Sequence, residues 1–359
     1  MRTRYVALAV GAAAWLACAW LWHAERAALL AAYLAAWWFW IGTMLGGLAN
    51  VWLHNLTGGR WGEAIRVPLL AHAQPMWLAA LLFLPIAFGL GELYPWAATA
   101  AGGMARWHHL LTAPGFKNLW LAPGFFLARS VFYLVVWCAL ARLSARPALR
   151  RSQPFSAAAL IVYALTTGLA SVDWIMSLTP LWYSSVFGML QSTAQMMAGM
   201  ALGTLFAVRA ATPQVRRDLG NLLLMYVLSW AYLAFVQFLI IWSENLPHEI
   251  GWYLQRLHHG WTGMAHMLTL LLFCLPLLIL LSRRAKEAPA VLGPLAGWLL
   301  AMLLCYAWWL VLPSVPPARH GWLWIAPWPA LALAGVASLA YRAASRRVAR
   351  RTEGETFHG

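Results

Sequence analysis

Charged residues are scarce in this 359-residue sequence. Only 10% of its residues are charged, whereas soluble domains typically carry roughly 25%. So few charged side chains cannot coat a water-facing surface, which excludes a soluble globular domain as the bulk of the chain. Hydrophobic residues make up 63% of the sequence, and 25 of them are tryptophans. This composition is typical of an integral membrane protein with aromatic belts at both interfaces.

Cofactor motifs are also missing. Four cysteines stand singly in apolar stretches and form none of the spacings that hold zinc, iron–sulfur clusters or a c-type haem. No glycine-rich nucleotide loop or nucleophile elbow is present. The net charge of +15 does not indicate nucleic-acid binding, because the basic residues are spread over several separate gaps. We therefore expect this chain to bind no metal and no cofactor of its own.

Ten apolar runs occupy most of the sequence, and a run of about 20 residues can cross a bilayer as a helix. They lie at about 5–22, 28–49, 67–90, 122–143, 156–175, 183–208, 219–242, 259–282, 290–312 and 321–341. The pattern predicts one all-α integral membrane domain over residues 1–359, with about ten transmembrane helices. The first run has no convincing cleavage site and is interpreted as a retained span. The spacings Gly42-x-x-x-Gly46 and Gly199-x-x-x-Gly203 predict close helix contacts.

The basic residues alternate between gaps in the way that sets membrane orientation. Of the 25 Lys and Arg residues, 19 lie in one set of gaps and six in the other. By the positive-inside rule, the richly basic gaps and both termini face the cytoplasm. The outer gaps contain more Trp, His, Pro and acidic residues, and these loops are the better place to seek function.

The outer link between the fifth and sixth runs carries the first notable motif. Its polar and aromatic members are Asp173, Trp174, Met176, Ser177, Trp182, Tyr183 and Ser184. An ionisable residue inside a span is a functional candidate, because it costs on the order of 2.5–3.5 kcal/mol at the bilayer centre. Asp173 stands at the outer boundary, where the cost is smaller, so solvation or helix capping is the alternative explanation.

The outer link at residues 243–258 carries the second notable motif. Asn245 suits an N-cap and Pro247 suits a first turn, so a short surface helix is predicted to begin here. Three positions of that helix lie close to one face, namely Glu249, Trp252 or Tyr253, and Arg256. This face either holds the head of an amphipathic ligand or lies in the headgroup layer.

These two links resemble the signatures of a known family. Residues 173–178 followed by 182–184 are similar to the D-W-x-M-S-L…W-[YF]-S motif of the F-type membrane subunit of bacterial alternative complex III. That complex is a quinol:cytochrome c oxidoreductase, in the superfamily of polysulfide and nitrite reductase membrane anchors. Residues 238–256 resemble the second signature of the subunit. A third similarity runs from Lys117 to Arg129 and opens the fourth run.

The resemblance implies two four-helix bundles, spans 2–5 and 6–9, flanked by spans 1 and 10. It implies a bacterial inner membrane and a respiratory electron-transport complex. The implied partners are a homologous C-type membrane subunit, an iron–sulfur subunit, multihaem and monohaem cytochrome c subunits and, in some cases, a terminal oxidase. Haem c and iron–sulfur clusters are then expected in the partners, with quinol or quinone as the ligand. The chain is not expected to be catalytic alone.

The third similarity contains one departure from the family pattern. Relatives often carry an acidic residue before the proline upstream of the lysine, whereas this sequence has Ala113 before Pro114. If that carboxylate relays protons in relatives, this chain lacks the relay or uses His108 or His109 instead.

Quinol oxidation releases two electrons and two protons, so its site needs an apolar slot, hydrogen-bond partners for both ring oxygens and a proton acceptor. Candidates for quinone binding and proton transfer are Asp173, Ser177 and Tyr183, with Asn245, Glu249 and Arg256 at the exit or at an extrinsic subunit. Two versions stay open. The chain binds quinol, or it is a structural and proton-conducting partner of the subunit that does. The alternatives are a purely structural anchor and a secondary transporter, although the apolar middles of the runs disfavour a transporter.

Overall fold

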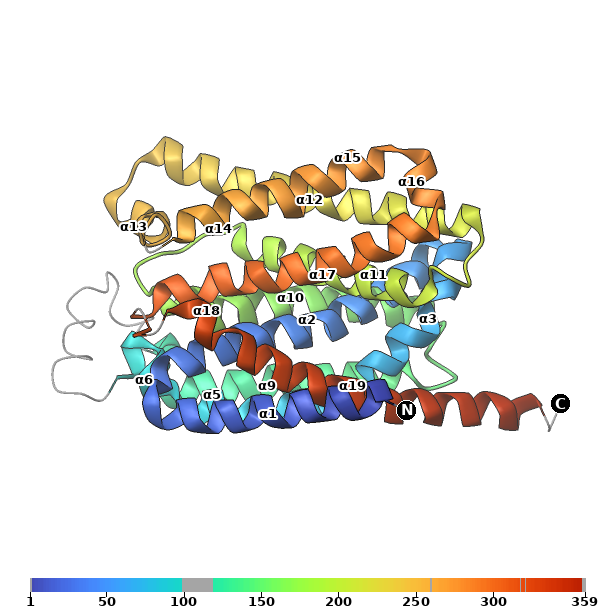
Figure 1. Ribbon diagram of the computed structural model, residues 1–359, viewed down its shortest axis with the longest axis horizontal. Coiled ribbons are helices and arrows are strands. Elements are labelled where there is room, and N and C mark those ends of the chain that lie inside the picture. The colour runs from blue at the N-terminus through green and yellow to red at the C-terminus, as the bar shows by residue number, and fades with distance from the viewer. Residues whose placement is uncertain (1, 99–118, 259, 317, 320, 357–359) are drawn as a thin grey trace.

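The structure is a computed structural model that describes residues 2–98, 119–258, 260–316, 318–319 and 321–356. Every regular element in these segments is helical, which confirms the all-α prediction. The long helices lie side by side along the longest dimension of the molecule (Figure 1).

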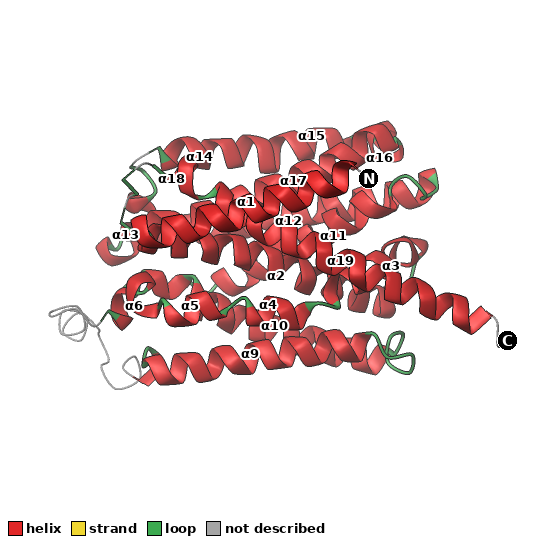
Figure 2. Cartoon of the chain, turned by 60° about the horizontal axis from the view of Figure 1, so that its bottom comes forward, coloured by secondary structure: helices red, strands yellow, loops and turns green. Residues whose placement is uncertain are grey.

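The long helices are α1 (Arg2–Ala24), α2 (Arg26–Thr57), α9 (Pro123–Ser144), α10 (Gln153–Trp174), α11 (Phe187–Ala207), α12 (Pro213–Glu244), α17 (Pro289–Val311) and α19 (Pro327–Thr356). A broken segment consists of α3 (Arg60–Ala73), α4 (Met76–Leu81), α5 (Leu84–Phe88), α6 (Leu90–Leu93) and the turn η1 (Pro95–Ala97). One further long helix consists of α14 (Trp261–Leu268), the π-helical turn η3 (Thr269–Cys274) and α15 (Leu275–Leu281). The short linking elements are η2 (Met176–Leu178), α13 (Pro247–Gln255), α16 (Arg283–Glu287), η4 (Leu312–Ser314) and α18 (Trp322–Ile325). Loops occur mainly at the two ends of the molecule and within the broken segment (Figure 2).

Proline and hydroxyl residues determine where several helices begin. Pro123 and Pro213 are the first residues of α9 and α12, where the missing N–H would have had no intrahelical partner. The side chains of Ser152 and Thr212 accept hydrogen bonds from backbone N–H groups in the first turns of α10 and α12, as N-cap residues do.

Seven of the described helices are long and apolar enough to cross a membrane, or eight if a bent pair counts as one span. That pair, Arg60–Ala73 and Met76–Phe88, bends by 42° and corresponds to the predicted run 67–90. The predicted run 183–208 corresponds to α11, which contains two glutamines and is not among the seven. The chain is therefore an all-α, multi-pass membrane protein, and the count of ten spans stays a prediction.

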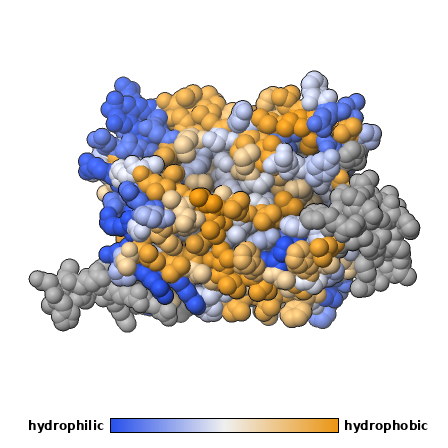
Figure 3. Space-filling model, turned by 180° about the vertical axis from the view of Figure 1, so that it is seen from behind, coloured by the Kyte–Doolittle hydropathy of each residue, from blue (hydrophilic) through white to orange (hydrophobic). Residues whose placement is uncertain are grey.

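Large hydrophobic side chains cover much of the flank of the molecule. Leu16, Phe132, Ile161 and Leu278 are each more than half exposed. Hydrophobic residues extend across the middle of the surface, while the most hydrophilic residues gather mainly toward the ends (Figure 3). Soluble monomers rarely expose apolar surface of this extent. This flank is therefore suited to contact with membrane lipid.

Helices α2 and α11 pack together at the centre through small residues. A Cβ atom at Gly46 or Gly199 would overlap backbone atoms of the opposite helix, which confirms that these spacings permit close approach. The Asn50 amide donates hydrogen bonds to the carbonyl oxygens of Gly46 at 2.7 Å and Met196 at 2.8 Å. Asn50 therefore fastens the two helices where their backbones come closest.

The remaining helices surround this central pair. Helix α2 also packs against α3, α10, α17 and α19, while α11 packs against α10, α12 and α17. Helix α1 lies along α19, and α9 lies beside α4 and α10. The predicted inner links meet at one end of the molecule, where Arg151 pairs with Glu63 at 2.9 Å and Arg216 donates to the Glu287 carbonyl oxygen at 2.6 Å.

Candidate functional site

The first motif lies where α10 ends, at the end of the molecule opposite those inner links. The helix stops at Trp174, the single turn η2 follows, and residues 179–186 lead into α11. Asp173 lies in the last turn of α10 and is completely buried. A buried carboxylate is costly unless it is paired and hydrogen-bonded, so its partners determine what it does.

Asp173 is fully paired by α9. Arg129 donates from Nε to Oδ2 and from Nη2 to Oδ1, both at 2.9 Å, and the Tyr133 hydroxyl donates to Oδ2 at 2.8 Å. This bidentate geometry is the strong form of an Arg–carboxylate pair. Arg129 also donates to the Trp120 carbonyl oxygen at 2.8 Å, and its guanidinium lies 4.0 Å from the centre of the Trp120 ring. Two of the three family-like segments therefore meet at one ion pair.

Trp174 holds the same hairpin from its other side. Its indole Nε1 donates to Ser130 Oγ at 2.9 Å, and its carbonyl oxygen accepts from the Tyr94 hydroxyl at 2.9 Å. The rings of Trp37 and Trp137 meet it edge to face, with centroid distances of 5.1 and 5.6 Å. Each aromatic pair of this kind adds roughly 0.5–1.5 kcal/mol of stabilisation beyond that of its buried area. The turn after α10 is therefore held by a rigid aromatic base, which consists of Trp37, Trp137 and Trp174.

A cavity of about 360 Å³ lies beside this hairpin, and we call it the outer pocket. Its lining residues are Trp120, Leu121, Val172, Met176, Ser177, Pro180, Trp182 and Tyr183. Most of these side chains are apolar or aromatic, and Ser177 and Tyr183 are the two that carry hydroxyl groups. The Ser177 hydroxyl donates a hydrogen bond to the Asp173 carbonyl oxygen. Mostly apolar cavities of roughly 300–1,000 Å³ with a few placed polar groups are the usual form of small-molecule sites.

The second motif joins the same region through stacked rings. Trp182 stacks on Trp252 with a centroid distance of 4.5 Å and an interplanar angle of 15°. Ser184 Oγ donates to Gln237 Oε1 of α12 at 3.1 Å. Since Trp182 lines the outer pocket, one wall of the pocket is supported by the second motif.

The predicted surface helix is confirmed as α13, which starts at Pro247. The prediction that Asn245 caps its N-terminus is wrong. Asn245 instead ends α12 in the left-handed conformation, with φ of 52°, which Asn tolerates better than most residues. Glu249 lies in the first turn of α13 and is buried, where the helix dipole favours a carboxylate.

Arg256 is almost completely buried and fastens α13 to α17. Its guanidinium donates to the carbonyl oxygens of Trp252 at 2.8 Å, Trp309 at 3.2 Å and Leu310 at 2.6 Å. It lies 3.4 Å from the centre of the Trp252 ring. Burial lowers the pKa of the guanidinium, so these carbonyl oxygens and the indole face are what hold a cation here. Arg256 satisfies the last carbonyl groups of α17, as basic residues at helix C-termini do.

The predicted residues therefore fall into two groups. Ser177 and Tyr183 line the outer pocket, while the Asp173 carboxylate faces Arg129 behind its wall. Glu249, Trp252 and Arg256 belong to the neighbouring α13 region, and Asn245 is exposed. Lys117, His108, His109, Ala113 and Pro114 lie outside the described residues.

Sequence reasoning missed a row of buried polar side chains near the middle of the helices. Trp38 donates to Gln191 at 3.2 Å, Gln191 donates to Tyr306 at 3.1 Å, and Tyr163 donates to Gln195 at 3.2 Å. The row continues with the Tyr226 hydroxyl, which donates to Asn50 Oδ1 at 2.8 Å. The expectation that the spans are apolar through their middles is therefore wrong for the contact between α2 and α11.

A small cavity adjoins this row. It measures about 30 Å³ and is lined by Gln191 and Gln195, among others, which gives room for a water molecule. The Gln195 Nε2 has no hydrogen-bond partner within the described part of the chain, so one face of the cavity offers a donor. The signal that could have revealed the row is the spacing of Gln191 and Gln195, one helical turn apart in an otherwise apolar run.

Two comparisons with known proteins found no match. No protein-family model matches the chain, and no curated protein matches it. The family resemblance therefore rests on the three motifs, and the geometry of the site supplies the remaining support for a function.

Proposed function

We propose that this chain is an integral membrane subunit of a respiratory quinol:acceptor oxidoreductase and that its outer pocket binds quinol. The observation that carries the proposal is the outer pocket itself. It is mostly apolar, it has the volume of a small-molecule site, and its lining includes two residues with hydroxyl groups, Ser177 and Tyr183. All three family-like segments contribute to its wall or support it.

The chemistry divides between this chain and its partners. A bound quinol places its ring between apolar walls that include Val172 and Met176, with its oxygens beside the two hydroxyls. Oxidation to quinone releases two protons and two electrons, and the electrons need acceptors in partner subunits, which by the resemblance hold iron–sulfur clusters and haem c. The contribution of this chain is to bind and orient the ring.

Asp173 acts in this proposal as a positioning residue. Its carboxylate holds Arg129, and Arg129 in turn lies over the ring of Trp120, which lines the pocket. Losing the carboxylate would release the guanidinium and with it one wall of the pocket. The ion pair therefore supports the shape of the site.

The buried polar row favours a second function, proton conduction. Hydroxyl and amide groups from α2, α10, α11, α12 and α17 form hydrogen-bonded steps, and the small cavity beside Gln195 fits a bridging water. This row supports the version in which the chain is a proton-conducting partner of a quinol-oxidising subunit. Polar groups at mid-membrane also occur in transporters. However, the described members of the row are all neutral, and most of them form hydrogen bonds with one another; they are Trp38, Asn50, Tyr163, Gln191, Gln195, Tyr226 and Tyr306. A secondary transporter and a purely structural anchor are therefore weaker alternatives than a proton-conducting subunit.

The proposed topology has ten spans with both termini in the cytoplasm of a bacterial inner membrane. The gathering of basic links at one end supports this orientation, because the positive-inside rule requires them to share a side. The packing of α2 with α3 and α10, of α4 with α9, and of α11 with α12 and α17 supports two four-helix bundles. The contact of α1 with α19 supports placing the first and last spans together.

A pocket-filling variant tests quinol binding. Val172→Trp places a large ring in the outer pocket, whereas Leu165→Trp adds the same ring two turns away on the exposed flank of α10. In membranes with equal amounts of assembled complex, we expect Val172→Trp to lower quinol oxidation and bound quinone at least about tenfold, and Leu165→Trp to leave both unchanged. Unchanged turnover in Val172→Trp at full assembly would exclude the outer pocket as the quinol site and leave the proton-conducting version.

A further inference from the structure

A larger cavity of about 610 Å³ lies at the end of the molecule opposite the outer pocket, and we call it the basic cavity. The bent pair of helices, the turn that follows α9, and α19 form its walls. Its charged lining consists of Glu63, Arg66, Arg142, Arg150 and Arg151. Four guanidinium groups against one carboxylate leave a cavity with a net charge of +3, which is suited to an anion.

The single carboxylate is already engaged. Arg151 binds Glu63 with two hydrogen bonds of 3.0 and 2.9 Å. The guanidinium groups of Arg142 and Arg150 have no acceptor among the described residues, and both side chains are exposed. The cavity therefore contains two guanidinium groups without a counter-ion from the described part of the chain.

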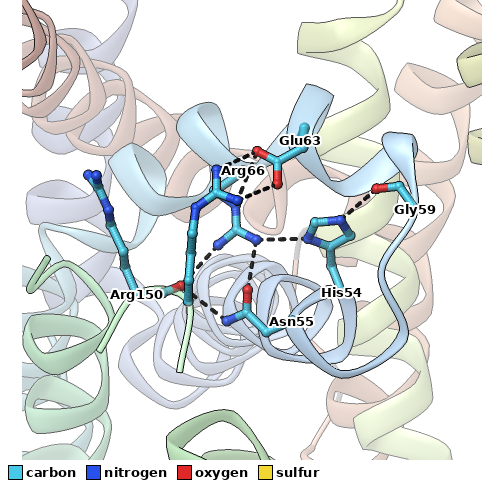
Figure 4. Close-up of polar contacts among 7 residues, drawn as sticks. His54, Asn55, Gly59, Glu63, Arg66 and Arg150 are labelled. Atoms are coloured by element: carbon cyan, nitrogen blue, oxygen red, sulfur yellow. Dashed lines mark hydrogen bonds and ion pairs between the residues drawn. The ribbon is translucent and has the colours of Figure 1, made fainter. Parts of the chain in front are cut away.

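Arg66 is held at the back of the cavity by neutral hydrogen-bond acceptors and by an ion pair with Glu63 (Figure 4). It donates to His54 Nδ1 at 2.8 Å, to Asn55 Oδ1 at 2.7 Å and to the Arg150 carbonyl oxygen at 3.0 Å. The Nε2–H group of His54 donates a hydrogen bond to the Gly59 carbonyl oxygen at 2.7 Å, so the Nδ1 atom that faces Arg66 is an acceptor.

The network leaves part of Arg66 unsatisfied. Arg66 is only 6% exposed, and its Nε has no hydrogen-bond partner within the described chain. The ion pair of this Nε with Glu63 Oε2 spans 3.7 Å, which is beyond hydrogen-bonding range. The side chain of Arg150 extends away from this network (Figure 4), so its guanidinium is not needed to hold Arg66.

The other walls of the basic cavity are apolar and face the flank of the molecule. Val67 and Trp77 lie on the two arms of the bent pair and are 55% and 51% exposed. Helix α19 contributes small side chains, Ala340 and Ala343, to the lining. In a membrane protein such a wall is in contact with acyl chains. The cavity therefore has an apolar side that faces lipid and a cationic side that is lined by arginines.

We infer that the basic cavity binds an anionic phospholipid. Its phosphate lies between Arg142 and Arg150, with Arg66 at the back, and its acyl chains run along Val67 and Trp77. Basic pockets between membrane helices on the side of the basic links are suited to such headgroups. A lipid with two phosphates, such as cardiolipin, matches the charge of +3 better than a lipid with one. The inference rests on the membrane character of the chain and is independent of the proposed quinol site.

Lipid titration of the purified full-length protein, with any subunits that accompany it, tests the inference. Native mass spectrometry measures the binding of cardiolipin, phosphatidylglycerol and phosphatidylcholine after delipidation. We expect cardiolipin to bind most tightly and phosphatidylcholine least. In Arg142→Gln/Arg150→Gln the affinity for cardiolipin should fall about thirtyfold, since each surface Arg near anionic lipid contributes on the order of a fivefold change.

The matched control is Arg209→Gln/Arg284→Gln, which removes two exposed charges at the same end but outside the cavity. It should bind cardiolipin within about twofold of the unmodified protein. A second variant, Ala343→Trp, fills the cavity without changing charge and should also lose binding. Equal binding of phosphatidylcholine, or unchanged affinity in both cavity variants, would overturn the inference. Binding of inorganic phosphate that displaces the lipid would make this a soluble-phosphate site and overturn it as well.

Discussion

At Asp173 a carboxylate without access to solvent is balanced by one guanidinium and one phenol hydroxyl. Each partner comes from α9, so a single side chain ties the end of α10 to the start of its neighbour. Pairing removes most of the cost of burying the charge, but it makes each partner depend on the other. The residue is therefore both a structural clamp and, through Arg129 and Trp120, a support for the outer pocket.

Asp173→Asn keeps the size of the side chain and leaves Arg129 without its counter-ion. We expect the free energy of unfolding to fall by about 3–5 kcal/mol, because one buried charge is then unpaired. The double variant Asp173→Asn/Arg129→Gln removes both charges and should recover a large part of the loss. Thermal unfolding in detergent, followed by tryptophan fluorescence, measures the difference. Equal stability of the single variant and the unmodified protein would show that the ion pair contributes nothing.

Arg256 makes a second prediction at this scale. Its planar guanidinium reaches three carbonyl oxygens and stacks on Trp252, a geometry that an ammonium group cannot reproduce. We expect Arg256→Lys to loosen the link at residues 243–258 nearly as much as Arg256→Gln does. Limited proteolysis of that link, with the exposed Arg284→Lys as the control, measures the effect. Protection of Arg256→Lys to the level of the unmodified protein would mean that charge alone suffices.

At the residue scale, the local sequence pattern predicts where helices begin and end better than it predicts which side chains meet. The position of Asp173 near a helix end and the α13 helix follow from local pattern. The pairing of Asp173 with Arg129, 44 residues earlier in the chain, and the αL conformation of Asn245 do not. Such pairings depend on how distant helices pack, and a single sequence does not show that.

Among the elements, α2 and α11 determine the centre of the molecule. Their close approach needs glycine, because a Cβ at Gly46 would overlap the backbone of α11. The short distance also brings Asn50 within reach of the Met196 carbonyl oxygen at 2.8 Å. Small residues at helix contacts and interhelical hydrogen bonds are the main attractive forces between membrane helices.

Gly46→Ala tests this contact. The added methyl group forces the two helices apart, and we expect a loss of about 1–3 kcal/mol in stability, as for overpacked cores. The matched control is Gly297→Ala in α17, where a Cβ would meet nothing within 4 Å. The control should be neutral or slightly stabilising, because Ala restricts the unfolded chain. If both variants unfold at the same temperature, the close contact is not what holds α2 against α11.

Sequence reasoning located most elements but not the role of α11. Hydropathy averages over a run, so Gln191 and Gln195 are hidden among apolar neighbours. Their partners, Tyr306 and Tyr163, lie on other helices. The bend of 42° in the run 67–90 lies at Pro75, and proline interrupts a helix wherever it stands inside one. The hydrogen bonds of the two glutamines therefore depend on tertiary contacts, whereas the bend has a local cause in the sequence.

At the scale of the whole molecule, the two ends differ in chemistry. One end carries the outer pocket with its rigid aromatic base, and the other carries the basic cavity and the links rich in Arg. The polar row lies between them, near the middle of the helices. This difference between the ends agrees with the proposed function and with the inferred lipid site, in which quinol binds at one end, anionic lipid binds at the other, and partner subunits accept the electrons.

Affinity isolation of the tagged protein from membranes in a mild detergent tests the central claim most directly. Mass spectrometry identifies the accompanying subunits, and a reduced-minus-oxidised spectrum detects haem. The account predicts co-purification with iron–sulfur and multihaem cytochrome c subunits and a spectrum of c-type haem. Isolation of a colourless protein without such subunits, from membranes that stay intact until solubilisation, would contradict it and make a transporter the leading alternative.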